Sequence, residues 1–305
     1  MGKQCKVSFK VPSKENGSKG LLDYIHSDVW GPAPTRSNGG ARYFVTFMDD
    51  FSRKVWVYFM KEKAEVLEKF KEWKVEVENQ TGRMIKYLRS DNGGEYKSCK
   101  FIKFCKVEGI TRHFTVKKNP QQNGAAERMN RTLLERARCM RLHAGMPESF
   151  WAEAVNHACY LVNRSPSKVL EFKSAEEVWM GKKIDYSNLK VFGCKAYALI
   201  PSDERNKLQS KSLECIFLGF EKGVKGFKLY DMAHKKKILS RDVVFDEASM
   251  PKEETKDDGE RGVVTEIPIT TKISDSENEE VQQEVVFAEL RSIAQERQRK
   301  VSKPP

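Results

Sequence analysis

The stretch MIKYLRSDNGGEY, residues 84–96, is a β-like run that ends on an acidic residue and is followed by two glycines. Asp, Asn and Gly are common turn formers, so one interpretation is an ordinary turn. The other interpretation is that Asp91 is a metal ligand at a strand end, with the glycines leaving space for a substrate backbone. The rest of the sequence has to decide between the two.

The pattern around this stretch predicts a mixed α/β sheet. Two β-rich runs, 42–50 and 54–60, are joined by only three residues, which predicts an antiparallel hairpin. Apolar residues at helical spacing predict an amphipathic helix over 63–79. Further strands are predicted at 21–30, 84–90 and 109–116, and further helices at 98–107, from about 125 onward and at 148–164. This order of elements predicts an α/β core with an antiparallel edge.

The second half of the chain has a different pattern. Four short β-like segments, at 191–201, 213–221, 226–233 and 236–245, follow one another without a helical repeat between them, which predicts a small β-barrel. The predicted organisation is therefore a polar leader over 1–17, a core over 18–183, a barrel over 189–248 and a tail over 249–305. The tail is poor in apolar residues and rich in acidic ones, which predicts disorder with a charged helix near 281–299.

Charge favours a polyanionic partner. The net charge of the chain is +12; residues 252–305 hold 9 Lys and Arg against 13 Asp and Glu, which leaves 46 against 30 in residues 1–251. Phosphate contacts favour nucleic acid as the partner of such a basic body. The seven cysteines form no C-x-x-C pair and the five histidines show no ligand spacing, so we predict reduced thiols and no zinc site. No apolar run is long enough for a membrane span and no signal peptide is evident, which predicts a soluble, intracellular protein.

Three acidic residues fall at comparable places in the predicted elements. Asp28 ends the first strand, Asp91 ends the fourth, and Glu127 lies in the first turn of the long helix, with 35 residues between the last two. Taken singly, Asp28 and Asp91 fit turns, and Glu127 fits a helix start stabilised by the macrodipole. Together they would repel one another unless Mg²⁺ or Mn²⁺ lay between them. Two such ions would support phosphodiester displacement.

Residues near the long helix are candidate DNA contacts. The loop 117–124 and the helix start are basic and polar, and Lys or Arg there would bind phosphates without reading sequence. The alternative is a solvated loop with surface ion pairs. The candidate DNA-binding residues are Lys117, Lys118, Asn123, Arg128, Asn130 and Arg131. We expect Asp49 and Asp50 to serve the hairpin turn, and His26 to pack structurally although it lies close to Asp28.

The runs LDYIHSDVWGP (22–32), LRSDNGGEY (88–96) and NPQQNGAAERMNR (119–131) resemble the integrase core of copia-type LTR-retrotransposon polyproteins, most like plant ones. The resemblance covers about residues 15–180. It implies a ribonuclease H-like fold and a catalytic, metal-binding triad at Asp28, Asp91 and Glu127. Residues 189–247 resemble the SH3-like barrel of these polyproteins. The run GKQCKVSF (2–9) resembles the end of their zinc-binding segment, so we expect a fragment that lacks most of this segment and the reverse transcriptase.

The resemblance implies a polynucleotidyl transferase that joins element cDNA to target DNA with two Mg²⁺ or Mn²⁺ ions, and that acts as an endonuclease when water is the nucleophile. It implies double-stranded DNA as partner, self-association into multimers, no membrane partner, and a nuclear location or a cytoplasmic particle. One alternative is a non-catalytic nucleic-acid-binding remnant of a decayed or host-adopted element. Another is an interaction protein that uses its acidic tail.

Overall fold

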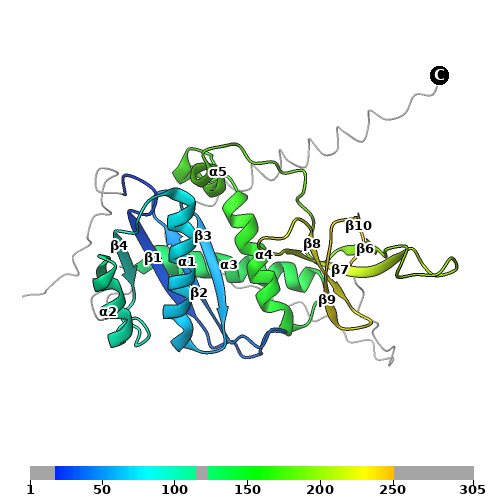
Figure 1. Cartoon of the computed structure of the whole chain (residues 1–305), viewed down its shortest axis with the longest axis horizontal. Coiled ribbons are helices and arrows are strands. Elements are labelled where there is room, and N and C mark those ends of the chain that lie inside the picture. The colour runs from blue at the N-terminus through cyan, green and yellow to red at the C-terminus, as the bar shows by residue number, and fades with distance from the viewer. Residues whose placement is uncertain (1–17, 115–122, 251–305) are drawn as a thin grey trace, which may run out of the picture. The chain divides into compact units, whose positions relative to one another are not determined.

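The first half of the described chain contains a mixed five-stranded sheet (Figure 1). The computed structural model describes residues 18–114 and 123–250, all within the first of two compact units, Met1–Thr255. The strand order is β3-β2-β1-β4-β5. The strands are β1 (Tyr24–Trp30), β2 (Tyr43–Asp49), β3 (Val55–Met60), β4 (Tyr87–Ser90) and β5 (Thr111–Phe114). Strands β1, β2 and β3 pair antiparallel, whereas β4 pairs parallel with β1 and β5. The predicted hairpin and mixed sheet are confirmed.

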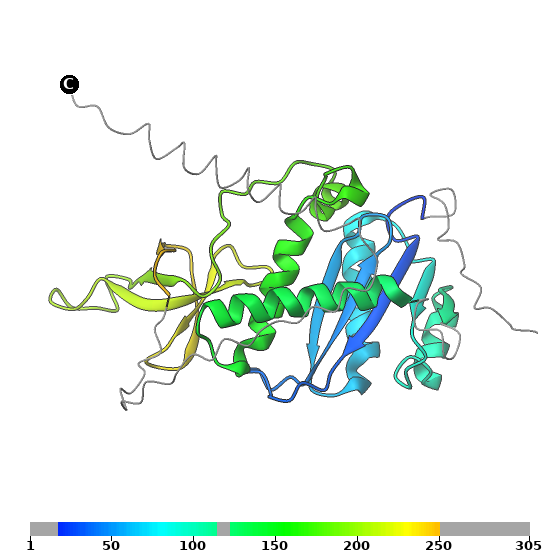
Figure 2. The same ribbon diagram turned by 180° about the vertical axis from the view of Figure 1, so that it is seen from behind.

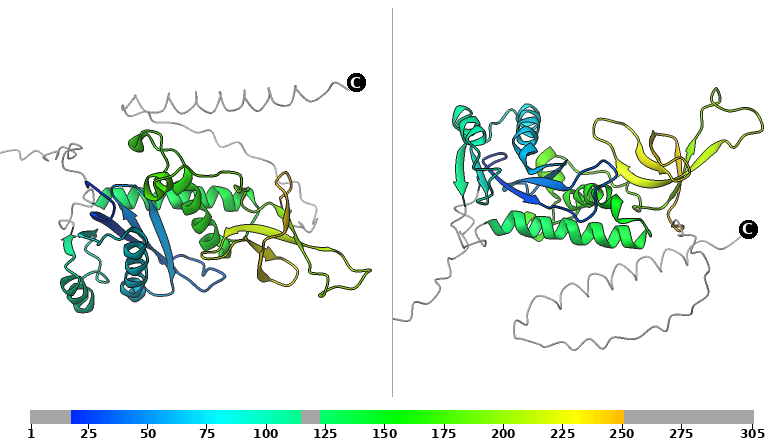
Figure 3. Two further views of the ribbon diagram at one scale, coloured as in Figure 1. Left: turned by 45° about the horizontal axis from the view of Figure 1, so that its top comes forward. Right: turned by 90° about the horizontal axis from the view of Figure 1, so that it is seen from below.

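Helices cover both faces of this sheet. Figure 3 shows α1 and α3 on opposite sides of it. The helices are α1 (Val66–Thr81), α2 (Cys99–Val107), α3 (Gly124–His143), α4 (Trp151–Arg164) and α5 (Ala175–Met180). Short 3₁₀ turns lie at Lys63–Glu65, Glu148–Phe150 and Lys168–Leu170. None of the helices in the described part of the chain is both long and apolar enough to cross a membrane.

Strand β2 separates two hydrophobic clusters because its side chains alternate between the faces. Val45 and Phe47 belong to the cluster that contains α1, where Phe47 stacks on Trp73 at a centroid distance of 4.7 Å. Phe44 and Met48 belong to the cluster built with α3 and α4. Strand β2 is therefore buried on both faces of the sheet.

A second five-stranded sheet follows, and all its pairings are antiparallel. Its strands are β6 (Lys195–Leu199), β7 (Ser212–Phe220), β8 (Phe227–Asp231), β9 (Lys236–Ser240) and β10 (Val243–Asp246), in the order β10-β6-β7-β8-β9. The sequence predicts a small β domain here, with 236–245 as one segment. The structure divides that segment into β9 and β10 at Arg241 and Asp242.

Helix α4 packs against β7 of the second sheet. Ile216 and Leu218 of β7 lie in the same buried cluster as Val155 and Ala158 of α4. Beside them, His157 is 1% exposed and contacts the rings of Phe192, Phe217 and Phe220. The predictions made for the leader 1–17, for most of the loop 117–124 and for the tail after Met250 lie outside the described residues.

Candidate active site

Asp28 lies inside β1, two residues before the end where the sequence places it, and Asp91 directly follows the last residue of the parallel neighbour β4. Tyr24 of β1 pairs with Tyr87 of β4, and the register continues to His26 and Arg89. Carried two residues further, this register brings Asp28 beside Asp91. Adjacent strands are about 4.8 Å apart, so the two residues lie near each other toward the C-terminal ends of β1 and β4.

The residues after Asp91 form the turn that their composition favours. The backbone N–H of Gly93 donates to Asp91 Oδ1 at 3.0 Å, which is an Asx turn. A Cβ added at Gly94 would meet no atom within 4 Å, so the loop is open at this position. The turn interpretation is therefore right about the local structure. Asp91 Oδ1 is the oxygen that closes this turn.

A buried tyrosine ties this loop to β1. The Tyr96 hydroxyl lies 2.5 Å from Ser27 Oγ, one residue before Asp28, and Tyr96 is fully buried. Burial raises the pKa of Tyr96 well above its usual value, so the phenol stays neutral. On the other side, Arg112 donates to Ser90 Oγ at 3.0 Å, one residue before Asp91. Both acidic residues are thus held by their neighbours in sequence.

Helix α3 is anchored to β1 by two asparagines. Figure 2, the view from behind, shows α3 crossing in front of the sheet. Asn123 Nδ2 donates to the carbonyl of Ser27 at 3.3 Å, and Asn130 Nδ2 donates to Asp28 Oδ2 at 2.8 Å. Thr46 Oγ1 of β2 in turn donates to Asn130 Oδ1 at 2.9 Å. These bonds hold the first turns of α3, including Glu127, against the strand that carries Asp28.

The three carboxylates influence one another electrostatically. Burial raises the pKa of Asp28 to about 7, and the negative charges of Asp91 and Glu127 contribute to this rise, whereas the hydrogen bond from Asn130 opposes it. Within residues 18–114 and 123–250, no group of three or more His, Cys, Asp or Glu side chains is close enough to hold a metal ion. The charges of Asp91 and Glu127 therefore act on Asp28, although the three carboxylates do not form a compact group of ligands among the described residues.

The predicted DNA contacts divide into three groups. Lys117 and Lys118 lie outside the described residues. Arg128 and Arg131 are exposed on α3, as a phosphate contact requires. Asn123 and Asn130 are 0% and 3% exposed. Their burial is at odds with the prediction that they contact DNA, because both side chains are used inside the protein to bind β1.

The acidic pair at the end of β2 serves the hairpin turn. Asp49 accepts hydrogen bonds from the backbone N–H groups of Leu22 and Ser52 and from the Ser52 hydroxyl. Asp50 Oδ1 lies 3.1 Å from His26 Nε2 and 3.2 Å from Arg53 Nη1. Burial opposes ionisation of Asp50, but these two partners lower its pKa well below the usual value. The contact between His26 and Asp50 is in line with the structural role expected for His26.

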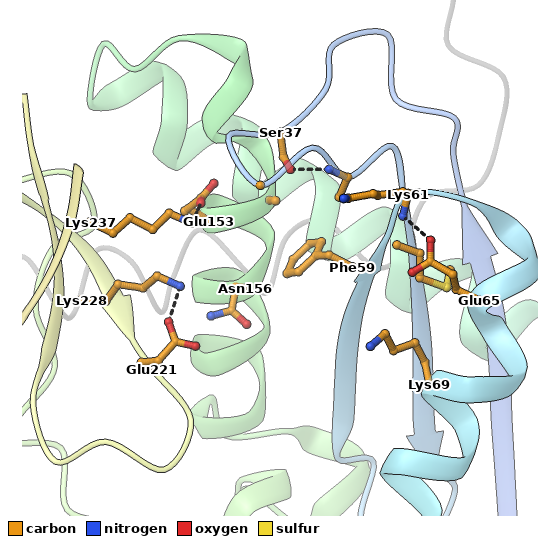
Figure 4. Close-up of a pocket in the computed structure, with 14 residues that line it drawn as sticks. Ser37, Phe59, Lys61, Glu65, Lys69, Glu153, Asn156, Glu221, Lys228 and Lys237 are labelled. Atoms are coloured by element: carbon orange, nitrogen blue, oxygen red, sulfur yellow. Dashed lines mark hydrogen bonds and ion pairs between the residues drawn. The ribbon is translucent and has the colours of Figure 1, made fainter. Parts of the chain in front are cut away.

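Two cavities lie apart from the three carboxylates. The larger, about 300 Å³, lies between β3, α4 and the second sheet (Figure 4). Lys228 there pairs with Glu221, and Lys237 pairs with Glu153 at 2.6 Å, so much of its charge is neutralised within the protein. The smaller, about 180 Å³, lies against α3 and is lined by two tryptophans.

Comparisons with known proteins match this architecture. Residues 22–120 match the family described as integrase core domain, and residues 194–259 match the retroviral polymerase SH3-like domain. The chain is 51% identical over 249 residues to a retrovirus-related Pol polyprotein from transposon TNT 1-94 of Nicotiana tabacum, which covers 82% of this chain and 19% of the polyprotein. It is 35% identical over 246 residues to that of transposon RE2 of Arabidopsis thaliana, covering 80% and 17%.

A solved structure, the HTLV-2 integrase catalytic core domain in complex with magnesium in a trimeric form, aligns with a TM-score of 0.39 and 18% identity. The alignment covers 52% of this chain and 95% of that one. Against the curated relatives, the chain spans about a fifth of their length or less.

Proposed function

Because this chain belongs to the integrase region of copia-type transposon Pol polyproteins, we propose that it is a divalent-metal-dependent strand transferase whose catalytic carboxylates are Asp28, Asp91 and Glu127. One observation carries the proposal. Burial, followed by the negative charges of Asp91 and Glu127, raises the pKa of Asp28 to about 7. Like charges gathered around a buried carboxylate are typical of a site that binds cations.

The three residues suit Mg²⁺ or Mn²⁺, because they supply only carboxylate oxygens, two from neighbouring strands and one from the first turn of α3. Such hard cations prefer oxygen ligands and keep waters that a phosphate can replace. When bound, a pair of these ions supplies activation of the attacking oxygen and stabilisation of the leaving oxygen. Zinc is a poorer match, since no histidine or cysteine joins these three residues.

The protein's own groups orient the carboxylates. Asn130 donates to Asp28 Oδ2 and so fixes the orientation of this carboxylate. The Gly93 N–H fixes one oxygen of Asp91 in the same way. The exposed Arg128 and Arg131 on α3 would hold the phosphates of the DNA next to Glu127. Orientation of the carboxylates, cation binding and substrate binding are thus assigned to different groups of the same site.

The proposed substrates are the 3′ ends of element cDNA and a target duplex, and water in place of the 3′ hydroxyl would give nicking. Binding two DNA ends at once favours a multimer, and integration into chromosomes favours a nuclear site of action. The excess of 46 basic over 30 acidic residues in positions 1–251 suits such a partner.

A strand-transfer assay with purified protein, labelled donor ends and a plasmid target tests the proposal. We expect product with Mg²⁺ or Mn²⁺ and a loss of at least 100-fold in Asp91→Asn and in Glu127→Gln. Glu135→Gln is the matched control, since Glu135 is an exposed glutamate two turns further along α3. Equal activity in Asp91→Asn and the unmodified chain would overturn the proposal, and salt-dependent DNA binding without transfer would leave a nucleic-acid-binding module.

A thermal-shift titration gives a readout that needs no activity. Mg²⁺ bound only by the folded state raises the melting temperature through RT ln(1 + [L]/Kd). The unmodified chain should show this rise, and Asp28→Asn should lose most of it. An identical rise in both proteins would mean that the ion binds elsewhere.

A further inference from the structure

The smaller cavity has a mainly apolar lining that includes two tryptophan rings. Trp30 and Trp151 line it together with Leu134 and Val155. The ring centroids of the two tryptophans are 5.6 Å apart with the planes tilted by 60°. Its volume of about 180 Å³ is below the range of pockets for drug-sized ligands. A single flat ring system is the kind of group that it can hold.

The rim of this cavity is fixed before any ligand arrives. Trp151 Nε1 donates to the carbonyl of Thr35 at 3.0 Å, and Thr35 Oγ1 donates to Glu148 Oε2 at 2.7 Å. These bonds attach the loop after β1 to the start of α4. The cavity is therefore preformed, which lowers the entropic cost of binding.

The cavity lies on the same face of the sheet as the carboxylates. Asp28 and Trp30 are two residues apart in β1, so their side chains point to the same side. Asp28 contacts Asn130 of α3, and Trp30 packs in the cluster that contains Leu133 of α3. A substrate lying along α3 at Asp28 would therefore reach the cavity without crossing the sheet.

A row of residues along α3, three of them arginines, connects the two places. Glu127, Arg131, Leu134, Arg138 and Arg141 follow one another along α3 at steps of four, three, four and three residues, so they share one face of the helix. Arg138 and Arg141 line the cavity. From Glu127 to Arg138 the helix rises about 16 Å. A DNA strand at 3.4 Å per nucleotide covers this length in about five nucleotides.

The arginines of this row differ in their partners. Arg141 Nη1 donates to the carbonyl of Met146 at 2.6 Å. The side chains of Arg131 and Arg138 form no hydrogen bond or ion pair with other residues in the described ranges. In the larger cavity, by contrast, Lys228 and Lys237 are already paired with glutamates. Free guanidinium groups beside an aromatic pocket suit a ligand with both a phosphate and a ring.

We propose that the cavity of Trp30 and Trp151 receives one unpaired base of the bound DNA, while Arg131 and Arg138 hold phosphates of the same strand. The proposal rests on the proposed function, since it places the strand by its reacting end at Asp28. Aromatic side chains bind bases through stacking, which is tolerant of sequence. Unpaired bases enter such a pocket with the smallest unstacking cost.

Fluorescence of 2-aminopurine tests this directly. The base is placed at successive positions, three to eight nucleotides from the reacting 3′ end of a DNA with an unpaired strand, and the full chain is added with EDTA to prevent chemistry. We expect quenching at one or two adjacent positions, because the base stacks on tryptophan there. An abasic site at the same position should weaken binding roughly tenfold.

Two variants separate the pocket from general DNA binding. Leu134 is partly buried in the wall of the cavity, so Leu134→Trp should fill the cavity and remove the quenching, with the melting temperature as the check on folding. Arg138→Gln should weaken binding and shift the quenching profile. Arg136→Gln is the matched control, because Arg136 is exposed on the same helix outside the row and its one hydrogen bond within the described residues is from Nη1 to Ser165 Oγ at 3.4 Å. It should leave the profile unchanged.

The outcomes distinguish the two proposals. Quenching that is unaffected by Leu134→Trp, or equal binding of abasic and intact DNA by a protein that transfers strands, overturns the base pocket alone. Unchanged transfer in Asp91→Asn overturns the catalytic assignment. Position-specific quenching that Leu134→Trp removes, in a protein without transfer activity, supports the pocket in a binding module.

Discussion

Replacing His157 with phenylalanine should remove an acid sensitivity that this side chain gives to the folded protein. His157 is 1% exposed, lies against β7, and neither ring nitrogen has a hydrogen-bond partner among the described residues. Burial lowers its pKa from 6.5 to about 4. The ring must therefore be neutral where it packs against Phe192 and Phe217.

The sign and size of the effect follow from these two pKa values. Above pH 6.5 the ring is neutral in the folded and the unfolded state, and its packing contributes fully to the free energy of unfolding. As the pH falls toward 4, the unfolded state takes up a proton and the folded state does not, so the free energy of unfolding falls. A pKa difference of this size can lower the free energy of unfolding by at most about 3 kcal/mol at low pH. Between pH 8 and pH 5 the expected loss is about 2 kcal/mol.

Urea unfolding of the full chain at pH 8 and pH 5, with EDTA and constant ionic strength, measures this loss. The difference between the unmodified chain and His157→Phe is the quantity of interest, because Asp28 titrates with the opposite sign. Because the pKa of Asp28 is raised to about 7 in the folded protein, Asp28 contributes to the free energy of unfolding at low pH, and this contribution is lost as the pH rises through that value. Subtracting the two profiles cancels this contribution and any constant packing cost of phenylalanine.

The control is His143→Gln, since His143 is exposed at the end of α3. This variant should keep the full loss of stability at pH 5. If the free energy of unfolding of His157→Phe changes between pH 8 and pH 5 by the same amount as that of the unmodified chain, then His157 is not the buried neutral group described above.

Three further predictions concern the carboxylates and their neighbours. Asn130→Ala should lower the free energy of unfolding by about 1–3 kcal/mol, measured by urea unfolding, and lower strand transfer at least tenfold, because Asp28 loses a charged hydrogen bond. Asp50→Asn should destabilise the fold by about 1–2 kcal/mol, since it breaks a partly buried ion pair, yet leave the Mg²⁺-dependent shift in melting temperature intact. Arg131→Gln should reduce the slope of log binding constant against log salt by about 1, measured by fluorescence anisotropy.

Much of the core fold follows from periodicity in the sequence. The alternation in 42–60 and the helical spacing in 63–79 each come from one face that is buried, so these elements were predictable. Helix α5 was not predicted, because its six residues are too short to show a repeat, although Ser174 and Glu177 form a capping box. The break between β9 and β10 was missed because Arg241 and Asp242 include no glycine or proline.

The candidate site was predictable in its acidic residues but not in their support. Asp28 and Asp91 are marked by local motifs at strand ends. Asn130, which the sequence offers as a DNA contact, falls in the row Ala126, Asn130, Leu133 and Ala137 that the sheet buries. A polar residue within an apolar helical stripe is the signal that could have identified it. Its partner Thr46 comes from another strand, and only the folded sheet brings the two together.

The packing of α4 against β7 has a practical consequence for anyone who works with pieces of this chain. Ile216 and Leu218 close the cluster that also holds Val155 and Ala158. Cutting the polypeptide near residue 190 would remove β7 and expose His157 to water, because its ring packs against Phe217 and Phe220. The shortened product should aggregate at concentrations where the full chain stays in solution, and a charged replacement of His157, whose ring faces β7, should restore its solubility.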